Sequence, residues 1–391
     1  MDYKALDKEY VANTYGKYSV QFVEGKGSLL YDEGGKEYID LGSGIGVTAF
    51  GINDPLWNEA VIGQVNKLSH VSNLYYTAPQ IELAKKLCEK TGMKKVFFSN
   101  SGAEANECAI KTARKYSTDK YGKDRNIIIT LVNSFHGRTV TTLAATGQKV
   151  FHDHFYPFTE GFIYAEANDS EALKALVDAN PNICAIMIET IQGEGGVMPL
   201  EKEFVDTVVA CAKEKDLLVV VDEVQTGNGR TGKMYGYMNF GIEPDVVSTA
   251  KGLAGGLPMG ATLFNAKTES VLTEGSHGST FGGNPICAAG AVSVVDRLTE
   301  EFLQEVAKKG EYIKSELTGA KGVKSVAGMG LMLGIETEAP PKEIIAACLE
   351  KGVVVLSAKN KVRLLPALNI PEEQLKKGIA ILKEVIESSV K

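Results

Sequence analysis

The sequence predicts an α/β protein with a mainly parallel, doubly wound sheet and a second, smaller α+β domain. Short, β-branched and almost uncharged runs lead up to Asp222 and Lys251, and such runs are typical of buried parallel strands. Strand-like and helix-like stretches alternate before Pro285, as a doubly wound sheet requires. After Pro285 a long helical stretch is followed by short strands and helices, which indicates a separate domain.

The individual elements follow from these patterns. The central sheet is expected to contain strands at residues 96–98, 127–132, 183–189, 217–222, 245–251 and 261–264, with helices at 79–90, 99–116 and 201–215. Residues 27–32 and 35–40 predict a hairpin, and residues 286–318 predict a long helical stretch before strands at 330–336, 353–356 and 361–365. We therefore expect an N-terminal segment at 1–45 that packs with the small domain, a large domain at 46–285 and a small domain at 286–391.

Composition excludes several classes of protein. The 391 residues carry a formal net charge of −7, which argues against nucleic acid or an anionic membrane as the main partner. No apolar run approaches the roughly 18 residues of a transmembrane helix, and the N-terminus does not resemble a signal peptide. Six scattered cysteines predict free thiols in a reducing cytoplasm.

Asp222 and Lys251 are the main candidates for catalysis. In an open parallel sheet, groups at the carboxyl ends of the strands face the ligand crevice. A lysine and an aspartate in one crevice suit pyridoxal phosphate, because the lysine forms a Schiff base and the aspartate partners the pyridinium nitrogen. The plainer alternatives are an aspartate that caps a helix and a lysine that reaches solvent.

Two glycine-containing segments suit a phosphate group. Ser101-Gly102-Ala103 lies between a strand and a helix, where backbone N–H groups bind anions, although Ser101 alone also fits a simple helix cap. The glycine-rich loop at 277–285 contributes hydroxyl groups.

Further candidates lie on other loops and strands. Phe135 follows a strand, where an aromatic ring suits stacking on a flat cofactor, and Arg138 suits a carboxylate. Glu194 stands among glycines as a movable partner for an arginine, and Arg363 sits in an apolar strand that implies an anionic partner. His152 and His154 flank Asp153 without a third ligand, so we expect a surface loop and no metal.

Several strings together resemble the class III aminotransferases of the ornithine and acetylornithine type, which belong to the fold-type I pyridoxal phosphate-dependent transferases. The resemblance covers nearly the whole chain. Its strings are Asn13-Thr14-Tyr15-Gly16, Ser43-Gly44-Ile45-Gly46-Val47, Ser72-Asn73-Leu74-Tyr75-Tyr76, Ser134-Phe135-His136-Gly137-Arg138-Thr139, Ile191-Gln192-Gly193-Glu194, residues 222–232 and residues 279–285.

The resemblance implies roles around the cofactor pyridoxal 5'-phosphate. Lys251 bonds to the cofactor and transfers the proton, Asp222 holds the ring nitrogen protonated, and Gln225 bonds the phenolic oxygen. The phosphate and ring contacts fall to Ser101, Gly102, Ala103, Phe135 and His136. Thr280 reaches the phosphate of the neighbouring subunit, so the resemblance also implies a homodimer with its active site at the interface.

The resemblance also implies the reaction. N-acetylornithine would be transaminated with 2-oxoglutarate to give N-acetylglutamate 5-semialdehyde and glutamate, a step of arginine biosynthesis. Arg138 would bind the carboxylate of acetylornithine, Arg363 would bind that of 2-oxoglutarate or glutamate, and Glu194 would neutralise Arg363 in between. Tyr15 and Ser279 belong to the implied substrate-binding set.

Other activities remain open at this point. The amino donor is alternatively ornithine, succinylornithine, succinyl-diaminopimelate or 4-aminobutyrate, since the substrate pocket decides this. A racemase or mutase shares the same cofactor chemistry but needs no 2-oxoglutarate. A non-catalytic descendant is disfavoured by the presence of Lys251, Asp222 and both arginines.

Overall fold

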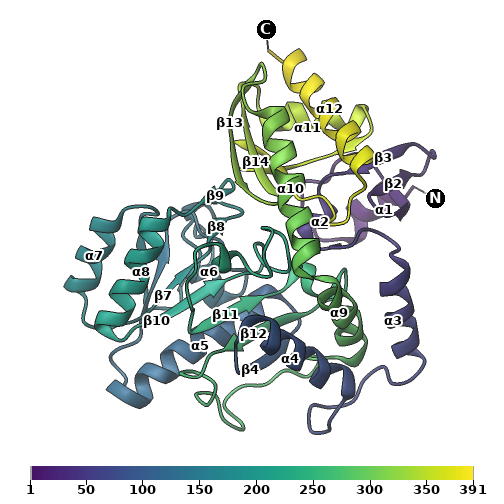
Figure 1. Cartoon of the computed structure of the whole chain (residues 1–391). Coiled ribbons are helices and arrows are strands. Elements are labelled where there is room, and N and C mark those ends of the chain that lie inside the picture. Colours follow the sequence, from purple (N-terminus) through teal and green to yellow (C-terminus); the bar gives the residue numbers. More distant parts are fainter. Residues whose placement is uncertain (1, 391) are drawn as a thin grey trace.

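The structure, a computed structural model that describes residues 2–390, is built around a seven-stranded sheet (Figure 1). The strand order is β4-β12-β11-β10-β7-β5-β6. Strand β12 is antiparallel to both neighbours, and the other pairings are parallel. The strands are β4 (Lys95–Ser99), β5 (Ile127–Leu131), β6 (Phe162–Ala165), β7 (Ile183–Ile188), β10 (Leu218–Asp222), β11 (Val246–Thr249) and β12 (Gly260–Phe264).

This sheet confirms the predicted α/β class, although the sequence analysis did not include β6. That strand lies at the edge of the sheet and is only partly buried, so it lacks the long apolar run of its neighbours. The opposite case is β10, which is buried throughout.

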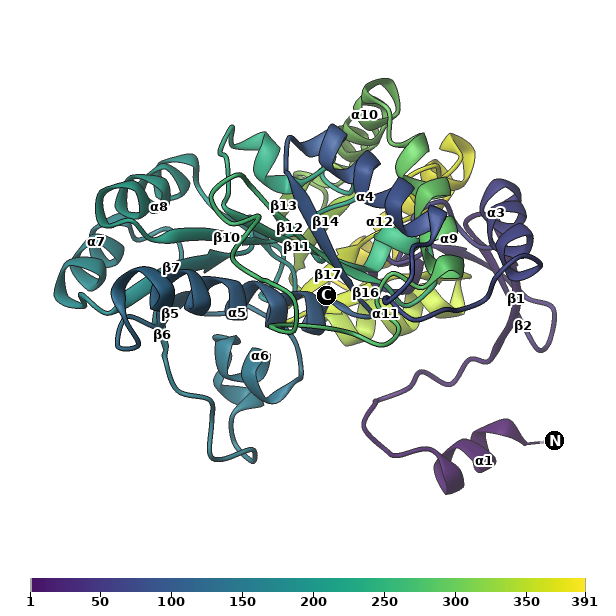
Figure 2. The ribbon, with the colours of Figure 1, turned by 90° about the horizontal axis from the view of Figure 1, so that it is seen from below.

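Side chains alternate along each strand, so neighbouring residues of a central strand pack against different helices on the two faces of the sheet. Val221 packs in one cluster with buried residues of α8 (Lys202–Lys215). Val220 points the other way and joins Ala109 of α5 (Gly102–Tyr121). Figure 2 shows these two helices on opposite sides of the strands. Burial on both faces explains why β10 appears in the sequence as an uninterrupted apolar run.

The C-terminal part forms a second, antiparallel sheet with the order β13-β14-β17-β16. The long helical stretch predicted at 286–318 is two helices, and Thr299 begins the second by accepting a hydrogen bond from the Phe302 N–H. The elements are α9 (Pro285–Arg297), α10 (Glu300–Leu317), β13 (Val323–Met329), β14 (Met332–Thr337), α11 (Pro341–Glu350), β16 (Leu356–Ala358), β17 (Lys361–Leu364) and α12 (Glu372–Ser388).

A third sheet joins strands from the N-terminal part of the chain to a strand from its C-terminal part. Strands β2 and β3 form the expected hairpin, and Ile39 of β3 lies opposite Val353 of β15 in a parallel pairing. Its strands are β1 (Phe22–Lys26), β2 (Leu29–Asp32), β3 (Glu37–Asp40) and β15 (Val353–Val354). The domain boundaries at residues 45 and 285 stay a prediction.

The remaining elements connect these layers. Helix α1 has no buried residue, and Figure 2 shows it at the end of an extended N-terminal segment. Among the described residues, no helix combines the length and apolarity needed to cross a membrane. The other elements are α1 (Tyr3–Tyr10), α2 (Ser43–Gly46), α3 (Pro55–Val65), α4 (Ala78–Thr91), α6 (Val140–Ala145), α7 (Ser170–Ala179), β8 (Ile191–Gln192), β9 (Met198–Pro199) and the 3₁₀ helices η1 (Lys149–Phe151), η2 (Gly236–Asn239) and η3 (Lys251–Ala254).

Candidate active site

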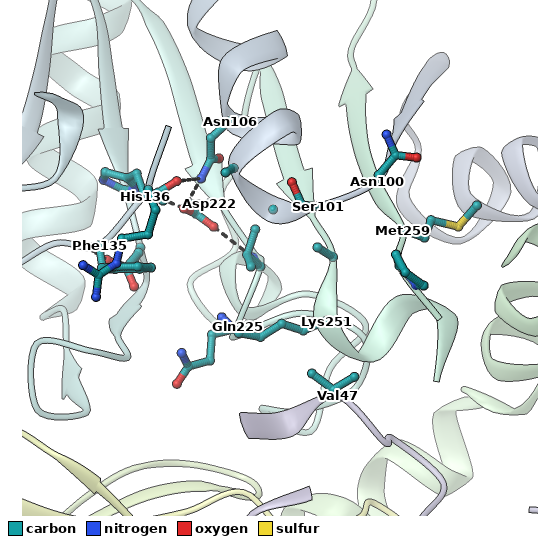
Figure 3. A pocket seen from close by; sticks show the side chains of 18 of the residues that line it. Val47, Asn100, Ser101, Asn106, Phe135, His136, Asp222, Gln225, Lys251 and Met259 are labelled. Atoms are coloured by element: carbon teal, nitrogen blue, oxygen red, sulfur yellow. Dashed lines mark hydrogen bonds and ion pairs between the residues drawn. The ribbon is translucent and has the colours of Figure 1, made fainter. Parts of the chain in front are cut away.

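A cavity of about 440 Å³ opens where the central parallel strands end. Figure 3 shows its walls, with Asp222 and His136 on one side and Lys251 beside Gln225. Nine of the residues singled out in the sequence line this cavity: Ser101, Gly102, Ala103, Phe135, His136, Arg138, Asp222, Gln225 and Lys251. Residues that are far apart in the chain therefore meet in one place.

The sequence analysis placed Lys251 at the end of a strand, and this prediction is wrong. Strand β11 ends at Thr249, and Lys251 begins η3 with a left-handed backbone at φ 44°. This conformation costs a non-glycine residue about 1–2 kcal/mol and is often kept at functional sites. Burial lowers the pKa of the Lys251 amine below its usual value, which favours the neutral, nucleophilic form.

The Asp222 carboxylate is held by three hydrogen bonds. Its Oδ2 lies 2.8 Å from Nδ1 of His136 and accepts from Nδ2 of Asn106 at 2.7 Å, while Oδ1 accepts from the Val224 N–H at 2.9 Å. Burial alone would lower the pKa of His136, but the bond to Asp222 raises it above its usual value. The carboxylate is therefore fixed in position at the cavity wall.

Asn106 and Ser248 are parts of this network that the sequence analysis missed. The Ser248 hydroxyl donates to Oδ1 of Asn106 at 2.5 Å, which orients the amide so that its Nδ2 faces Asp222. The same Nδ2 also bonds the His136 carbonyl at 2.7 Å. The available signal was a polar side chain on the buried face of α5, between Ala105 and Ala109.

The predicted phosphate segment begins helix α5, a 20-residue helix whose N-terminus opens into the cavity. The Ser101 hydroxyl accepts from the Glu104 N–H at 3.2 Å, so the capping role that the sequence allowed is present. Gly102 has no space for a side chain, since a Cβ there would lie 2.7 Å from Cγ1 of Val224. Backbone N–H groups and the helix dipole together suit an anion here.

Phe135 and Arg138 lie on the loop after β5. The Arg138 guanidinium carbon is 5.6 Å from the Phe135 ring centre and 4.2 Å from that of Phe151. Among the described residues, the arginine side chains in ion pairs with a carboxylate are those of Arg297 and Arg363, so Arg138, which lines the cavity, has no such partner. Its charge is thus held between aromatic rings and available to an anionic ligand.

Arg363, which is buried, and Glu194, which is partly exposed, form an ion pair beside the cavity. Nη1 of Arg363 lies 2.5 Å from Oε1 of Glu194 and 2.9 Å from Oε1 of Gln225. Burial would raise the pKa of Glu194, but Arg363 holds it below its usual value. Gln225 also donates from Nε2 to Glu194 at 3.1 Å, so these three side chains form one polar group.

Three predicted residues lie elsewhere within the chain. Ser279 and Thr280 line a second cavity together with Tyr75 and Tyr76, and the Ser279 hydroxyl accepts a hydrogen bond from Nδ2 of Asn100. Tyr15 belongs to the N-terminal segment and is 74% exposed. None of these three lines the cavity that contains Lys251.

The residues of the main cavity fit pyridoxal phosphate. The helix N-terminus of α5 offers an anion site, the fixed Asp222 carboxylate offers a partner for a ring N–H, and Lys251 lines the same cavity with an amine whose pKa is lowered. Fold and site together therefore define a pyridoxal phosphate-dependent enzyme.

Comparison with known proteins agrees with this class. The family model described as aminotransferase class-III matches residues 10–386. Acetylornithine aminotransferase from Haemophilus ducreyi is 51% identical, with 98% of each chain covered. Two solved structures are also similar. The ornithine aminotransferase from Toxoplasma gondii has a TM-score of 0.94 at 29% identity and covers 99% of this chain and 94% of its own. The N-acetylornithine aminotransferase from Stenotrophomonas maltophilia has a TM-score of 0.85 at 32% identity and covers 98% of each.

The chain belongs to the class-III aminotransferases, and it is an enzyme with pyridoxal phosphate as its cofactor. This confirms the resemblance found in the sequence. The roles of the individual site residues stay predictions.

Proposed function

We propose that this enzyme transfers the terminal amino group of N-acetylornithine to 2-oxoglutarate, giving N-acetylglutamate 5-semialdehyde and glutamate in arginine biosynthesis. The observation that carries the proposal is the Arg363–Glu194 pair near Lys251. A reaction with two different substrates needs an arginine whose charge is neutralised by a protein carboxylate at one stage and by a substrate carboxylate at the other. The name of the Haemophilus ducreyi relative, at 51% identity, supports the same substrate.

The residues around the cavity would each hold one part of the cofactor. Ser101, Gly102 and Ala103 would bind the phosphate, Phe135 would pack against the ring, and Asp222 would accept a hydrogen bond from the ring nitrogen. When bound, pyridoxal phosphate supplies an electron sink that stabilises negative charge on the substrate carbon. His136 and Asn106 orient the Asp222 carboxylate for this contact.

Lys251 would act as the base that moves the proton. Its lowered pKa leaves a larger share of the amine neutral, and only the neutral amine accepts a proton from the substrate carbon. Its place in the wall of the cavity puts the amine beside the site where the substrate would bind.

Two arginines would serve the two substrates. Arg138 would bind the α-carboxylate of N-acetylornithine while Glu194 neutralises Arg363. When 2-oxoglutarate enters, its carboxylate would replace Glu194 on Arg363. An uncompensated buried guanidinium is costly, so one anion or the other stays with Arg363 throughout.

The proposal includes a homodimer that works in the cytoplasm. Ser279, Thr280 and Tyr15 would contribute to the active site of the neighbouring subunit, which agrees with their position outside the Lys251 cavity of their own chain. The six cysteines are free thiols, as suits a reducing compartment.

A donor comparison tests this function. The purified enzyme with 2-oxoglutarate is assayed for glutamate formation from N-acetylornithine, N-succinylornithine, ornithine, succinyl-diaminopimelate and 4-aminobutyrate. The proposal expects the highest kcat/KM for N-acetylornithine. A higher value for another donor contradicts the substrate, and conversion of a substrate without 2-oxoglutarate contradicts transamination.

A further inference from the structure

We propose that Glu189 is a positioning residue that couples the Phe135 loop to the Glu194 loop and so sets how firmly Glu194 covers Arg363. The inference rests on the proposed function, because it assigns a role to Glu189 within the exchange between the two substrates. Glu189 directly follows strand β7 and is buried at the cavity wall. As with Asp222, the sequence signal was an apolar run that ends on a carboxylate.

The two oxygens of Glu189 hold two separate loops. Oε1 accepts from the Phe135 N–H at 2.8 Å, and Oε2 accepts from the Gly193 N–H at 3.1 Å. Phe135 lies 54 positions before Glu189, whereas Gly193 begins the turn that carries Glu194. A single side chain thus joins the wall that faces the cofactor to the segment that controls Arg363.

The segment held by Glu189 has little freedom to shift. A Cβ at Gly193 would lie 2.5 Å from Cδ of Gln225, so the backbone here is pressed against that side chain. The Gly193 carbonyl also lies 3.5 Å from Nη1 of Arg363. A displacement of Gly193 would therefore reach Gln225, Glu194 and Arg363 together.

A carboxylate is the group that this geometry requires. Both oxygens must accept, whereas the amide of glutamine has one acceptor and one donor, so Glu189→Gln leaves one buried N–H without a partner. Burial raises the pKa of Glu189 to about 7, and the two N–H groups, together with His136, act against that rise. The charged form is thus stabilised by the same contacts that join the loops.

The test compares the two halves of the reaction in Glu189→Gln. If Glu189 holds the Glu194 loop, loss of its carboxylate weakens the ion pair between Glu194 and Arg363, and 2-oxoglutarate displaces Glu194 more easily. The ratio of kcat/KM for 2-oxoglutarate to kcat/KM for N-acetylornithine should then rise roughly tenfold, the effect of one lost hydrogen bond. The rise should disappear when Glu194→Ala is already present, because Glu189 acts through Glu194.

A matched control separates positioning from general destabilisation. Asp245 likewise joins two segments through its carboxylate, to the Val219 N–H at 2.9 Å and to Asn265 at 3.0 Å, but it lies before strand β11, at the opposite end from the cavity. Asp245→Asn should lower the melting temperature without changing the ratio.

Each outcome has a definite meaning. An unchanged or lowered ratio in Glu189→Gln, or a rise that persists in the Glu194→Ala background, overturns the inference. If Glu189→Gln fails to fold, Glu189→Asp keeps the charge but is too short to hold both loops, and the same rise is expected. Failure of the wild-type enzyme to use N-acetylornithine would instead overturn the proposed function, and it is measured first.

Discussion

Replacing Asn106 by alanine tests the buried network behind the cofactor site. Nδ2 of Asn106 donates to Asp222 and to the His136 carbonyl, both at 2.7 Å, and Oδ1 accepts from Ser248. A hydrogen bond to a charged group contributes about 1.5–3 kcal/mol and a neutral one about 0.5–1.5 kcal/mol. Because all three partners are buried and lose their contact, Asn106→Ala should lower the free energy of unfolding by about 3–5 kcal/mol.

The assay is urea unfolding of the cofactor-free protein at one fixed protomer concentration, since cofactor and subunit binding both shift apparent stability. Asn180→Ala is the matched control. Asn180 makes one neutral bond to the Leu176 carbonyl and should lose only about 1 kcal/mol. Equal losses in the two variants would refute the reasoning.

Three further predictions concern catalysis, substrate exchange and pH. Lys251→Ala should fold with the wild-type circular dichroism spectrum and lose turnover, and appreciable activity would contradict its role as the base. Arg363→Gln should raise the KM for 2-oxoglutarate by about 100-fold, since it removes a charge-assisted contact, and a KM within threefold of wild type would contradict the assignment. Burial raises the pKa of Glu223 to about 7, so between its unfolded pKa and pH 7 the folded protein binds this proton more tightly than the unfolded chain does. The resulting contribution to stability is complete below the unfolded pKa and is lost as the pH rises through 7. The melting temperature should therefore fall less steeply between pH 5 and 8 in Glu223→Gln than in wild type, and identical slopes would contradict this.

The sequence allowed the sheet and nine residues of the cavity wall to be predicted, because each signal was local. The buried strand that ends on Asp222 is a continuous apolar run, and Ser101-Gly102-Ala103 stands directly between a strand and a helix. Such features depend on a few neighbouring residues and can be read without the fold.

Contacts across the chain could not be predicted in this way. Asn106 lies 116 positions from Asp222 and 142 from Ser248, and only the packing of α5 on the sheet brings them together. Glu189 was recognised as the end of a strand, but its two partners come from different loops. The left-handed turn at Lys251 also escaped prediction, because a β-branched run gives no sign of where its last residues leave the strand.

The most direct test of the central claim is the visible absorption spectrum of the purified enzyme, before and after addition of N-acetylornithine. The account predicts a band from cofactor bound at Lys251 that is lost with N-acetylornithine and returns with 2-oxoglutarate. A band that does not respond to N-acetylornithine would contradict the proposed substrate. The absence of any band after addition of pyridoxal phosphate would contradict the assignment of the site itself.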